Sequence, residues 1–328
     1  MSERLGAEEW ATYWQKGTIT TFHGRFAGNY DGAVREYWQG LFSALPAGAA
    51  ILDLATGNGA LALLAQQHSA REGLGHKVTG IDYADIDPPK QFSGKAFARH
   101  LRAIDFRGRA RLEDTGLDTA SFDLAISQFG FEYGEPEAAA REVARVLKPK
   151  VSTFAAMLHH AESAIIRQAK DGLAQIAACV KSGLSGAVRD LHKHLDRLAT
   201  RGEDPAQDSR AIDLRANINR ILAELQQEGG RYADPNQLVF YVENSMSTFN
   251  PQVTAGKPLA DKLAMLQHVT AETDAYRQRM RDLISSALTD PDIEAMKRRI
   301  QSHGFTTEED RPFVFEGTHF CHLLRFSR

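Results

Sequence analysis

Short apolar runs alternate with helix-like segments between residues 49 and 160, and no other feature restricts the possible folds as much. The helix-like segments repeat apolar residues at three- and four-residue spacing, as in 60–68 and 135–147. Strands that alternate with helices form crossover units and a parallel sheet. The expected strands lie within AAILDLA (49–55), KVTGIDY (77–83), FDLAISQFGF (122–131) and VSTFAAML (151–158).

Residues 161–290 have a different hydrophobic pattern, in which nearly all apolar residues follow helical spacing. Glycines at Gly202 and Gly229-Gly230 separate the helical patterns, and the segment 244–258 (NSMSTFNPQVTAGKP) is predicted to be a loop. This part of the chain is therefore predicted to be an inserted helical subdomain.

The last segment, 291–328, returns to the earlier pattern. Pro291 suits the first turn of a helix, and Gly304 suits the end of the same helix. Two apolar runs then flank Glu316-Gly317, which predicts a hairpin between two strands.

These patterns predict an α/β fold with a doubly wound, mostly parallel seven-stranded sheet and an antiparallel C-terminal hairpin. Residues 49–160 and 291–328 would form this domain, and the helical insert (161–290) would follow its fifth strand. Residues 1–48 are rich in aromatic side chains and are predicted to form an N-terminal cap. The insert is predicted to cover a pocket, to bind the substrate or to build a homodimer.

Charge and cysteine content exclude several classes of protein. With 39 Lys and Arg against 42 Asp and Glu, the net charge of −3 gives no general attraction to nucleic acids or anionic membranes. No apolar run approaches the roughly 20 residues that span a bilayer, and the N-terminus lacks the features of a signal peptide. Cys179 and Cys321 lie far apart, which favours a reduced, cytoplasmic protein. His192 and His194 are two positions apart and do not share a helix face, so no metal site is predicted.

The turn after the first expected strand carries the clearest functional signal. Gly57 and Gly59 leave the backbone open to close approach by a ligand, and the following helix offers N-terminal amides. Asp82 ends the next strand, where a carboxylate accepts the hydroxyls of an adenosine ribose. The residues therefore predict an adenosine-containing ligand.

Two cofactor classes fit such a site. Gly57-x-Gly59-x-x-Ala62 also satisfies the looser dinucleotide fingerprint, so NAD(P) is an alternative. The discriminating residue is Asp53, at the end of the first strand. Its carboxylate would repel a pyrophosphate, whereas it suits the ammonium and sulfonium charges of S-adenosylmethionine.

Several segments resemble the class I S-adenosylmethionine-dependent methyltransferases. ILDLATGNGALALLA (51–65) is similar to the family's acidic–apolar–small–x–Gly–x–Gly signature, and VTGIDYADI (78–86) to the segment with its ribose ligand. LEDTGLDTASFDLAISQFGFEY (112–133) and REVARVLKPK (141–150) are similar to the segments around its fourth strand. The resemblance covers roughly residues 40–160 and 291–328, and the expected hairpin fits it as well.

The resemblance implies S-adenosylmethionine as the cofactor, with Asp82 on the ribose and Tyr83 on the adenine. Either Glu113 or Asp114 would be the acid that contacts adenine, and Asp114 is preferred. Asp82 as a helix cap and Tyr83 as an ordinary surface aromatic are the alternatives without a ligand. The implied cofactor-binding residues are Asp53, Ala55, Gly57, Gly59, Asp82, Tyr83, Asp114 and Gln128.

The sequence also departs from the family pattern. Ala55 replaces the first glycine of the fullest signature, and Lys150-Val151 replaces a common Gly-Gly. The signature of nucleic-acid amino-methyltransferases, Asn/Asp-Pro-Pro-Tyr/Phe, is absent, because Ser127-Gln128-Phe129-Gly130 stands at that position. Methylation of DNA or RNA is therefore disfavoured.

Candidates for the methyl-transfer site follow the fourth and fifth strands, since ligands bind at the carboxyl ends of strands in open α/β sheets. Some of the residues after the fourth strand are predicted to line this site: Gln128, Phe129, Phe131, Glu132 and Tyr133. His159 and His160 end the fifth strand. A histidine here could take a proton from an acceptor hydroxyl or amine, although a solvated strand end is an equal alternative. The aromatic run 12–26 could fold over the cofactor, or simply belong to the core.

The sequence therefore predicts a methyltransferase that acts on an O or N atom of a small-molecule or peptide-like acceptor. An NAD(P)-dependent oxidoreductase and a non-catalytic S-adenosylmethionine-binding scaffold are the alternatives. The predicted partners include neither nucleic acid nor a membrane, and a homodimer through the helical insert is possible.

Overall fold

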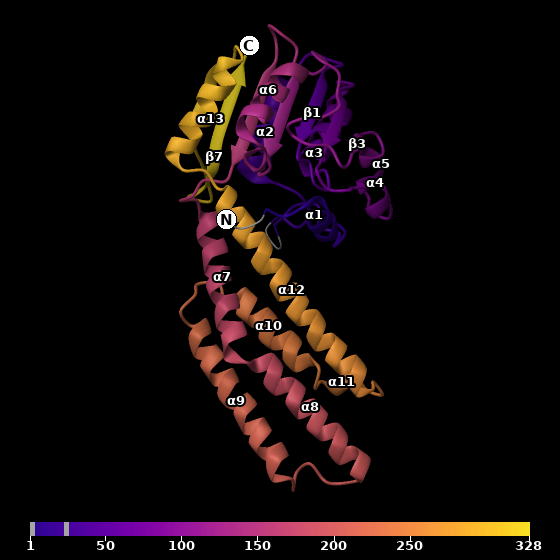
Figure 1. Cartoon of the computed structure of the whole chain (residues 1–328). Coiled ribbons are helices and arrows are strands. Elements are labelled where there is room, and N and C mark those ends of the chain that lie inside the picture. Colours follow the sequence, from indigo (N-terminus) through magenta and orange to yellow (C-terminus); the bar gives the residue numbers. More distant parts are fainter. Residues whose placement is uncertain (1–3, 23–25) are drawn as a thin grey trace. The chain divides into compact units, whose positions relative to one another are not determined.

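The computed structural model describes residues 4–22 and 26–328 of the chain (Figure 1). They divide into two compact units. The sheet unit contains the described residues up to Ile166 together with Ser285–Arg328, and the helical unit is Arg167–Ile284.

The sheet unit is built on one seven-stranded sheet with the order β3-β2-β1-β4-β5-β7-β6. All neighbouring pairs up to β5 are parallel, whereas β7 is antiparallel to both β5 and β6. This confirms the predicted α/β fold with a C-terminal antiparallel hairpin. The strands are β1 (Ala50–Leu54), β2 (Lys77–Ile81), β3 (Asp105–Arg107), β4 (Leu124–Gln128), β5 (Thr153–Leu158), β6 (Thr306–Phe315) and β7 (Thr318–Ser327).

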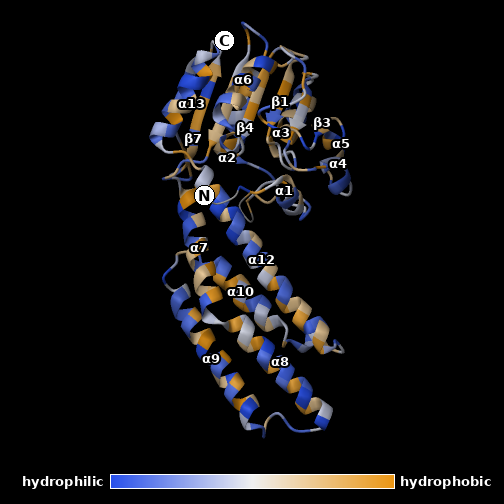
Figure 2. Cartoon of the chain, in the orientation of Figure 1, coloured by the Kyte–Doolittle hydropathy of each residue, from blue (hydrophilic) through white to orange (hydrophobic). Residues whose placement is uncertain are grey.

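Two hydrophobic clusters pack on opposite faces of the sheet, because side chains alternate along each strand. Ile51 belongs to the cluster that includes Trp38 and Leu64, whereas the adjacent Leu52 belongs to the cluster that includes Val143 and Ile293. Figure 2 shows the central strands β1 and β4 as predominantly hydrophobic. The first cluster draws on α2 (Gly32–Ser43) and α3 (Ala60–Glu72), and the second on α6 (Pro136–Val146) and α13 (Asp290–Ser302).

Short helices complete this unit. They are α1 (Ala7–Trp14), α4 (Pro88–Gln91), α5 (Ala98–Leu101) and the 3₁₀ helix η1 (Phe131–Tyr133).

The C-terminal segment forms as the sequence predicts. Pro291 lies in the first turn of α13, and Gly304 follows its end with a φ of +88°. Glu316 and Gly317 connect β6 to β7 with φ angles of +49° and +76°. Two consecutive positive φ angles are typical of the tight turns that match the twist of a hairpin.

The helical unit contains antiparallel helices around a core that includes Val188, Ile221 and Leu266. Among the described residues, no helix is long and apolar enough to cross a membrane. The N-terminal residues of α7 and the C-terminal residues of α12 belong to the sheet unit, because the division falls after Ile166 and before Ser285. The helices are α7 (Ala164–Ser182), α8 (Leu184–Arg201), α9 (Ser209–Gly229), α10 (Asn236–Ser247), α11 (Pro251–Thr254) and α12 (Leu259–Ser286).

The predicted loop at 244–258 is wrong in part, because α10 continues to Ser247 and α11 occupies Pro251–Thr254. Ser245 and Thr248 are fully buried, and the Thr248 hydroxyl donates to the Ser245 carbonyl over 2.8 Å. Tertiary packing thus overrides the turn-forming composition of this segment.

Candidate functional site

The turn after β1 is fixed by a buried carboxylate. Asp53 is 2% exposed, and its Oδ2 accepts hydrogen bonds from the Thr56 hydroxyl at 2.5 Å and from the Ala62 N–H at 3.0 Å. Burial raises the pKa of Asp53 to about 7. Asp53 therefore ties the end of the strand to the first turn of α3.

Asp82 connects the end of β2 to the same turn. Its Oδ2 accepts the Gly57 N–H at 2.7 Å, and its Oδ1 accepts the Ala84 N–H at 2.9 Å. Burial raises the pKa of Asp82 to about 6. A carboxylate offers about four lone-pair sites, so each oxygen retains acceptor capacity for a further donor.

Gly57 and Gly59 both have positive φ angles, +55° and +85°. A Cβ on Gly57 would lie 2.3 Å from the ring of Trp14, and a Cβ on Gly59 would lie 2.6 Å from the ring of Phe106. Both glycines are therefore required by conformation and by space.

Trp14 brings the N-terminal aromatic segment onto the glycine turn. Its carbonyl oxygen accepts hydrogen bonds from Asn58 Nδ2 at 2.9 Å and from Gln91 Nε2 at 2.5 Å. Asn58 Nδ2 also donates to the Thr18 carbonyl at 2.7 Å. The aromatic run 12–26 thus lies against the turn as far as it is described, and its residues 23–25 lie outside the described part of the chain.

The adenine-contact candidates lie nearer the surface. Tyr83 is 42% exposed, with the Arg111 guanidinium 5.5 Å from the centroid of its ring. Glu113 Oε1 accepts the Glu135 N–H at 2.7 Å, whereas Asp114 is exposed. Asp114 is therefore the more accessible of the two acids considered.

Gln128, at the end of β4, has an unsatisfied buried donor. Its Oε1 accepts the indole N–H of Trp38 at 2.6 Å. Its Nε2 is buried without a hydrogen bond of good geometry among the described residues, although the Gln128 side chain also interacts with the Tyr30 hydroxyl. A buried polar atom without a partner is costly, so this amide suits a ligand with an acceptor group.

His159 follows β5 and lies among side chains from the end of β4. Its backbone N–H donates to Glu132 Oε1 at 2.8 Å, and its ring Nδ1 lies 2.7 Å from the same oxygen. The Phe129 ring stacks on the imidazole with a centroid distance of 4.4 Å and an interplanar angle of 20°. The Tyr133 ring stands edge-on to it at 6.5 Å.

His160 is directed to different partners. Its Nε2 lies 3.0 Å from Asp290 Oδ1 at the start of α13, and its Nδ1 accepts the Glu162 N–H at 3.3 Å. Its ring centroid is 4.9 Å from that of His319. The structure therefore engages both ring nitrogens of His160 away from the Glu132 carboxylate.

Glu132 is one of the residues after the fourth strand that the sequence predicts as candidates to line the methyl-transfer site, but the sequence gives it no individual role. Its side chain is fully buried, and it contacts a residue 27 positions away. The only available signal was an acidic residue between aromatic ones, Phe131 and Tyr133.

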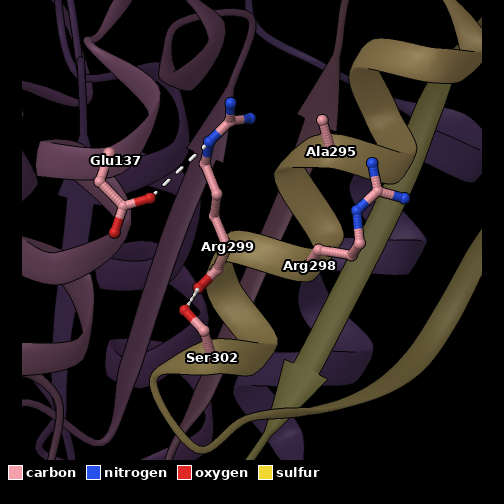
Figure 3. A pocket seen from close by; sticks show the side chains of 5 residues that line it. All are labelled: Glu137, Ala295, Arg298, Arg299 and Ser302. Atoms are coloured by element: carbon pink, nitrogen blue, oxygen red, sulfur yellow. Dashed lines mark hydrogen bonds and ion pairs between the residues drawn. The ribbon is translucent and has the colours of Figure 1, made fainter.

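A further pocket lies between α6 and α13 (Figure 3). Glu137 turns toward Arg299, with 3.8 Å between its Oε2 and the arginine Nε. None of its lining residues was singled out by the sequence; they are Glu137, Ala295, Arg298, Arg299 and Ser302.

Comparison with known proteins finds a match for part of the sheet unit. Residues 51–150 match a family model described as a methyltransferase domain. A search of curated proteins finds no match.

Solved structures with partial similarity include three bacterial proteins. The YcgJ protein from Bacillus subtilis is 22% identical, with 43% of this chain and 58% of that chain covered and a TM-score of 0.32. An S-adenosylmethionine-dependent methyltransferase from Aquifex aeolicus is 22% identical (39% and 65% covered, TM-score 0.33). One from Mesorhizobium loti is 28% identical (38% and 53% covered, TM-score 0.29). The chain thus spans less than two thirds of each of these proteins.

Proposed function

Residues 51–150 are a methyltransferase domain, and from this premise we propose that the protein methylates an oxygen or nitrogen atom of a small-molecule or peptide-like acceptor. S-adenosylmethionine is the methyl donor. One observation carries the proposal: the glycine turn after β1 and His159 after β5 flank the end of β4 at the carboxyl edge of the sheet. This edge is where open α/β sheets bind ligands.

The residues at this edge fit the cofactor. Asp82 keeps acceptor capacity for the ribose hydroxyls, and the unsatisfied Gln128 Nε2 suits the carboxylate of the methionine moiety. In this proposal Asp53, Ala55, Gly57 and Gly59 shape the turn against the cofactor, and Tyr83 and Asp114 contact its adenine. When bound, S-adenosylmethionine supplies the methyl group on a positively charged sulfur.

The buried carboxyl group of Asp53 disfavours the dinucleotide alternative. Asp53 is 2% exposed and hydrogen-bonds with Thr56 in the turn. A pyrophosphate placed there would face this acidic group in a poorly solvated site, whereas Asp82 suits the adenosine ribose of either cofactor. The sulfonium and ammonium groups of S-adenosylmethionine would instead be attracted.

Alignment of the acceptor and exclusion of water are the chain's main contributions to the reaction, because reactants held close in the right orientation react faster. His159 is our candidate to take the acceptor's proton, with Tyr133 lining the same site. His160 would support the strand end through Asp290. The helical unit would bind the acceptor or a second copy of the chain.

Calorimetric titration with S-adenosylmethionine, S-adenosylhomocysteine, NADH and NADPH tests the cofactor assignment. We expect micromolar binding of the first two and none of the nicotinamides. Binding of a nicotinamide alone would overturn the proposal. Incubation with methyl-labelled S-adenosylmethionine and pools of hydroxyl and amine compounds then separates an enzyme from a non-catalytic scaffold.

A further inference from the structure

The helix α1 lies across the carboxyl ends of three neighbouring strands. The Trp14 ring lies against Gly57, which follows β1, and it shares a small hydrophobic cluster with Ala84, which follows β2. The Trp10 ring stands edge-on to that of Tyr133, which follows β4, with 5.8 Å between the ring centroids. The strands β2, β1 and β4 are adjacent in the sheet. One short helix therefore spans the edge at which open α/β sheets bind ligands.

The contact between Trp14 and Gly57 leaves no room between the two residues. A Cβ placed on Gly57 would lie 2.3, 2.6 and 2.8 Å from three carbon atoms of the indole ring. A ligand atom at that place would clash in the same way, since non-bonded carbon atoms stay about 3.5–4 Å apart. The Gly57 N–H donates to Asp82 Oδ2 at 2.7 Å, so the covered glycine adjoins the carboxylate proposed for the ribose. Trp14 therefore occupies space that a closely bound cofactor needs.

Two side chains hold α1 in this position through the same acceptor. The Trp14 carbonyl accepts hydrogen bonds from Asn58 Nδ2 at 2.9 Å and from Gln91 Nε2 at 2.5 Å. Asn58 belongs to the glycine turn and is fully buried, and its Nδ2 also donates to the Thr18 carbonyl at 2.7 Å. A shift of the turn is therefore transmitted directly to the end of α1.

The apolar contacts of α1 are separate from the two clusters that cover the sheet. Ala11, Tyr13 and Trp14 form their own small cluster with Ala84, and these four residues are not members of the clusters on the sheet faces. A segment with few buried apolar contacts opens at a lower free energy than the core. The helix can therefore leave the turn without exposing the clusters that hold the sheet together.

We propose that α1 is a lid that blocks the cofactor site through Trp14, so that S-adenosylmethionine binds only when α1 moves away from the glycine turn. The role of α1 as a lid rests on the proposed function, because its ligand is S-adenosylmethionine. When a ligand binds only one of two conformations, its apparent affinity is reduced by the fraction of the protein in that conformation. Variants that weaken the closed form should therefore bind the cofactor more tightly.

Two variants loosen the closed form in different ways. Trp14→Ala removes the blocking ring, whereas Gln91→Ala keeps the ring and removes one hydrogen bond to the Trp14 carbonyl. Calorimetric titration with S-adenosylhomocysteine compares both with the wild type. We expect Gln91→Ala to bind this ligand roughly two- to tenfold more tightly, the factor that corresponds to one hydrogen bond, and Trp14→Ala to bind it at least as tightly. Lys90→Ala is the matched control, because it changes an exposed residue beside Gln91 on α4, and it should leave the affinity unchanged.

Hydrogen exchange detected by mass spectrometry reports the movement itself. We expect the backbone amides of residues 7–14 to exchange faster when S-adenosylhomocysteine is added to the wild type, because displacement from the turn exposes them. The amides of α13, which packs on the opposite face of the sheet from α3, are the internal reference and should not change.

Unchanged or weaker binding by both Trp14→Ala and Gln91→Ala would overturn the lid. Slower or unchanged exchange of residues 7–14 in the wild-type complex would also overturn it, because α1 would then remain on the turn. If Trp14→Ala does not fold, Gln91→Ala and the wild-type exchange still decide. A wild type and variants that all fail to bind S-adenosylhomocysteine would overturn the cofactor assignment and the lid with it, whereas binding by the variants alone would support the lid.

Discussion

Ala55 and Gly130 face each other so closely that only one of them has room for a Cβ. A Cβ on Gly130 would lie 2.4 Å from that of Ala55. Ala55 has a φ of +54°, a region that alanine adopts only at a cost. The alanine that departs from the methyltransferase signature is thus accommodated by a glycine at the end of β4.

Gly130→Ala should therefore destabilise the protein by about 1–3 kcal/mol, the usual range for overpacking a tight contact. Ala55→Gly should be close to neutral, because it removes both a strained φ and a methyl group. Combined with Gly130→Ala, it should recover most of the loss. Urea denaturation of the two single variants and the double variant measures this coupling, and additive effects would contradict the direct contact.

Gly57→Ala should destabilise more than Gly73→Ala. Both glycines have positive φ, +55° and +66°, but a Cβ on Gly57 would strike Trp14, whereas nothing lies within 4 Å of one on Gly73. Backbone strain of about 1 kcal/mol is common to the two variants, and the excess loss in Gly57→Ala measures the Trp14 contact. Equal melting temperatures of Gly57→Ala and Gly73→Ala would mean that the Trp14 ring moves away from the new Cβ at no cost in stability.

Asp82→Ala should weaken binding of S-adenosylmethionine by about 1–3 kcal/mol, because charge-assisted hydrogen bonds are lost. The variant also leaves the Gly57 N–H without its acceptor. Asp85→Ala is the control, since this exposed carboxylate pairs with Arg109 on the surface. Calorimetric titration of the folded variants with S-adenosylmethionine measures the two affinities. An unchanged affinity in Asp82→Ala would disprove the ribose assignment.

Asp53 should make the protein less stable as the pH rises from about 4 to about 7. Burial raises its folded-state pKa from 3.8 to about 7, so in this range the folded state binds more protons than the unfolded state. Stability then falls with increasing pH, and the penalty is complete above the folded pKa. Asp53→Asn cannot titrate.

Urea denaturation of Asp53→Asn and wild type at several pH values tests this expectation. The variant should gain stability relative to wild type as the pH increases through this window. A difference that does not vary with pH would show that Asp53 titrates normally in the folded protein.

Local patterns in the sequence were sufficient for β1, β2, β4, β5, the C-terminal hairpin and the glycine turn, whereas the short strand β3 (Asp105–Arg107) was not located. The nearly continuous apolar runs of β1, β4 and β5 are typical of strands buried on both faces of a sheet, and Glu316-Gly317 specifies its hairpin through local backbone preference. Such signals depend on neighbours within a few residues. The loop prediction for 244–258 was partly wrong for the same reason, because the burial of Thr248 depends on tertiary contacts and not on its neighbours in sequence.

The sequence by itself was sufficient to predict the strand, the glycine turn and the helix that carry Asp53, Gly57 and Gly59. It did not distinguish the roles of His159 and His160, because strand alternation places them on opposite faces without showing which partners each one meets. Only the tertiary structure brought Glu132 against His159 and directed His160 to Asp290. These pairings join residues 27 and 130 positions apart in the sequence, and they form only when tertiary packing brings the distant segments together.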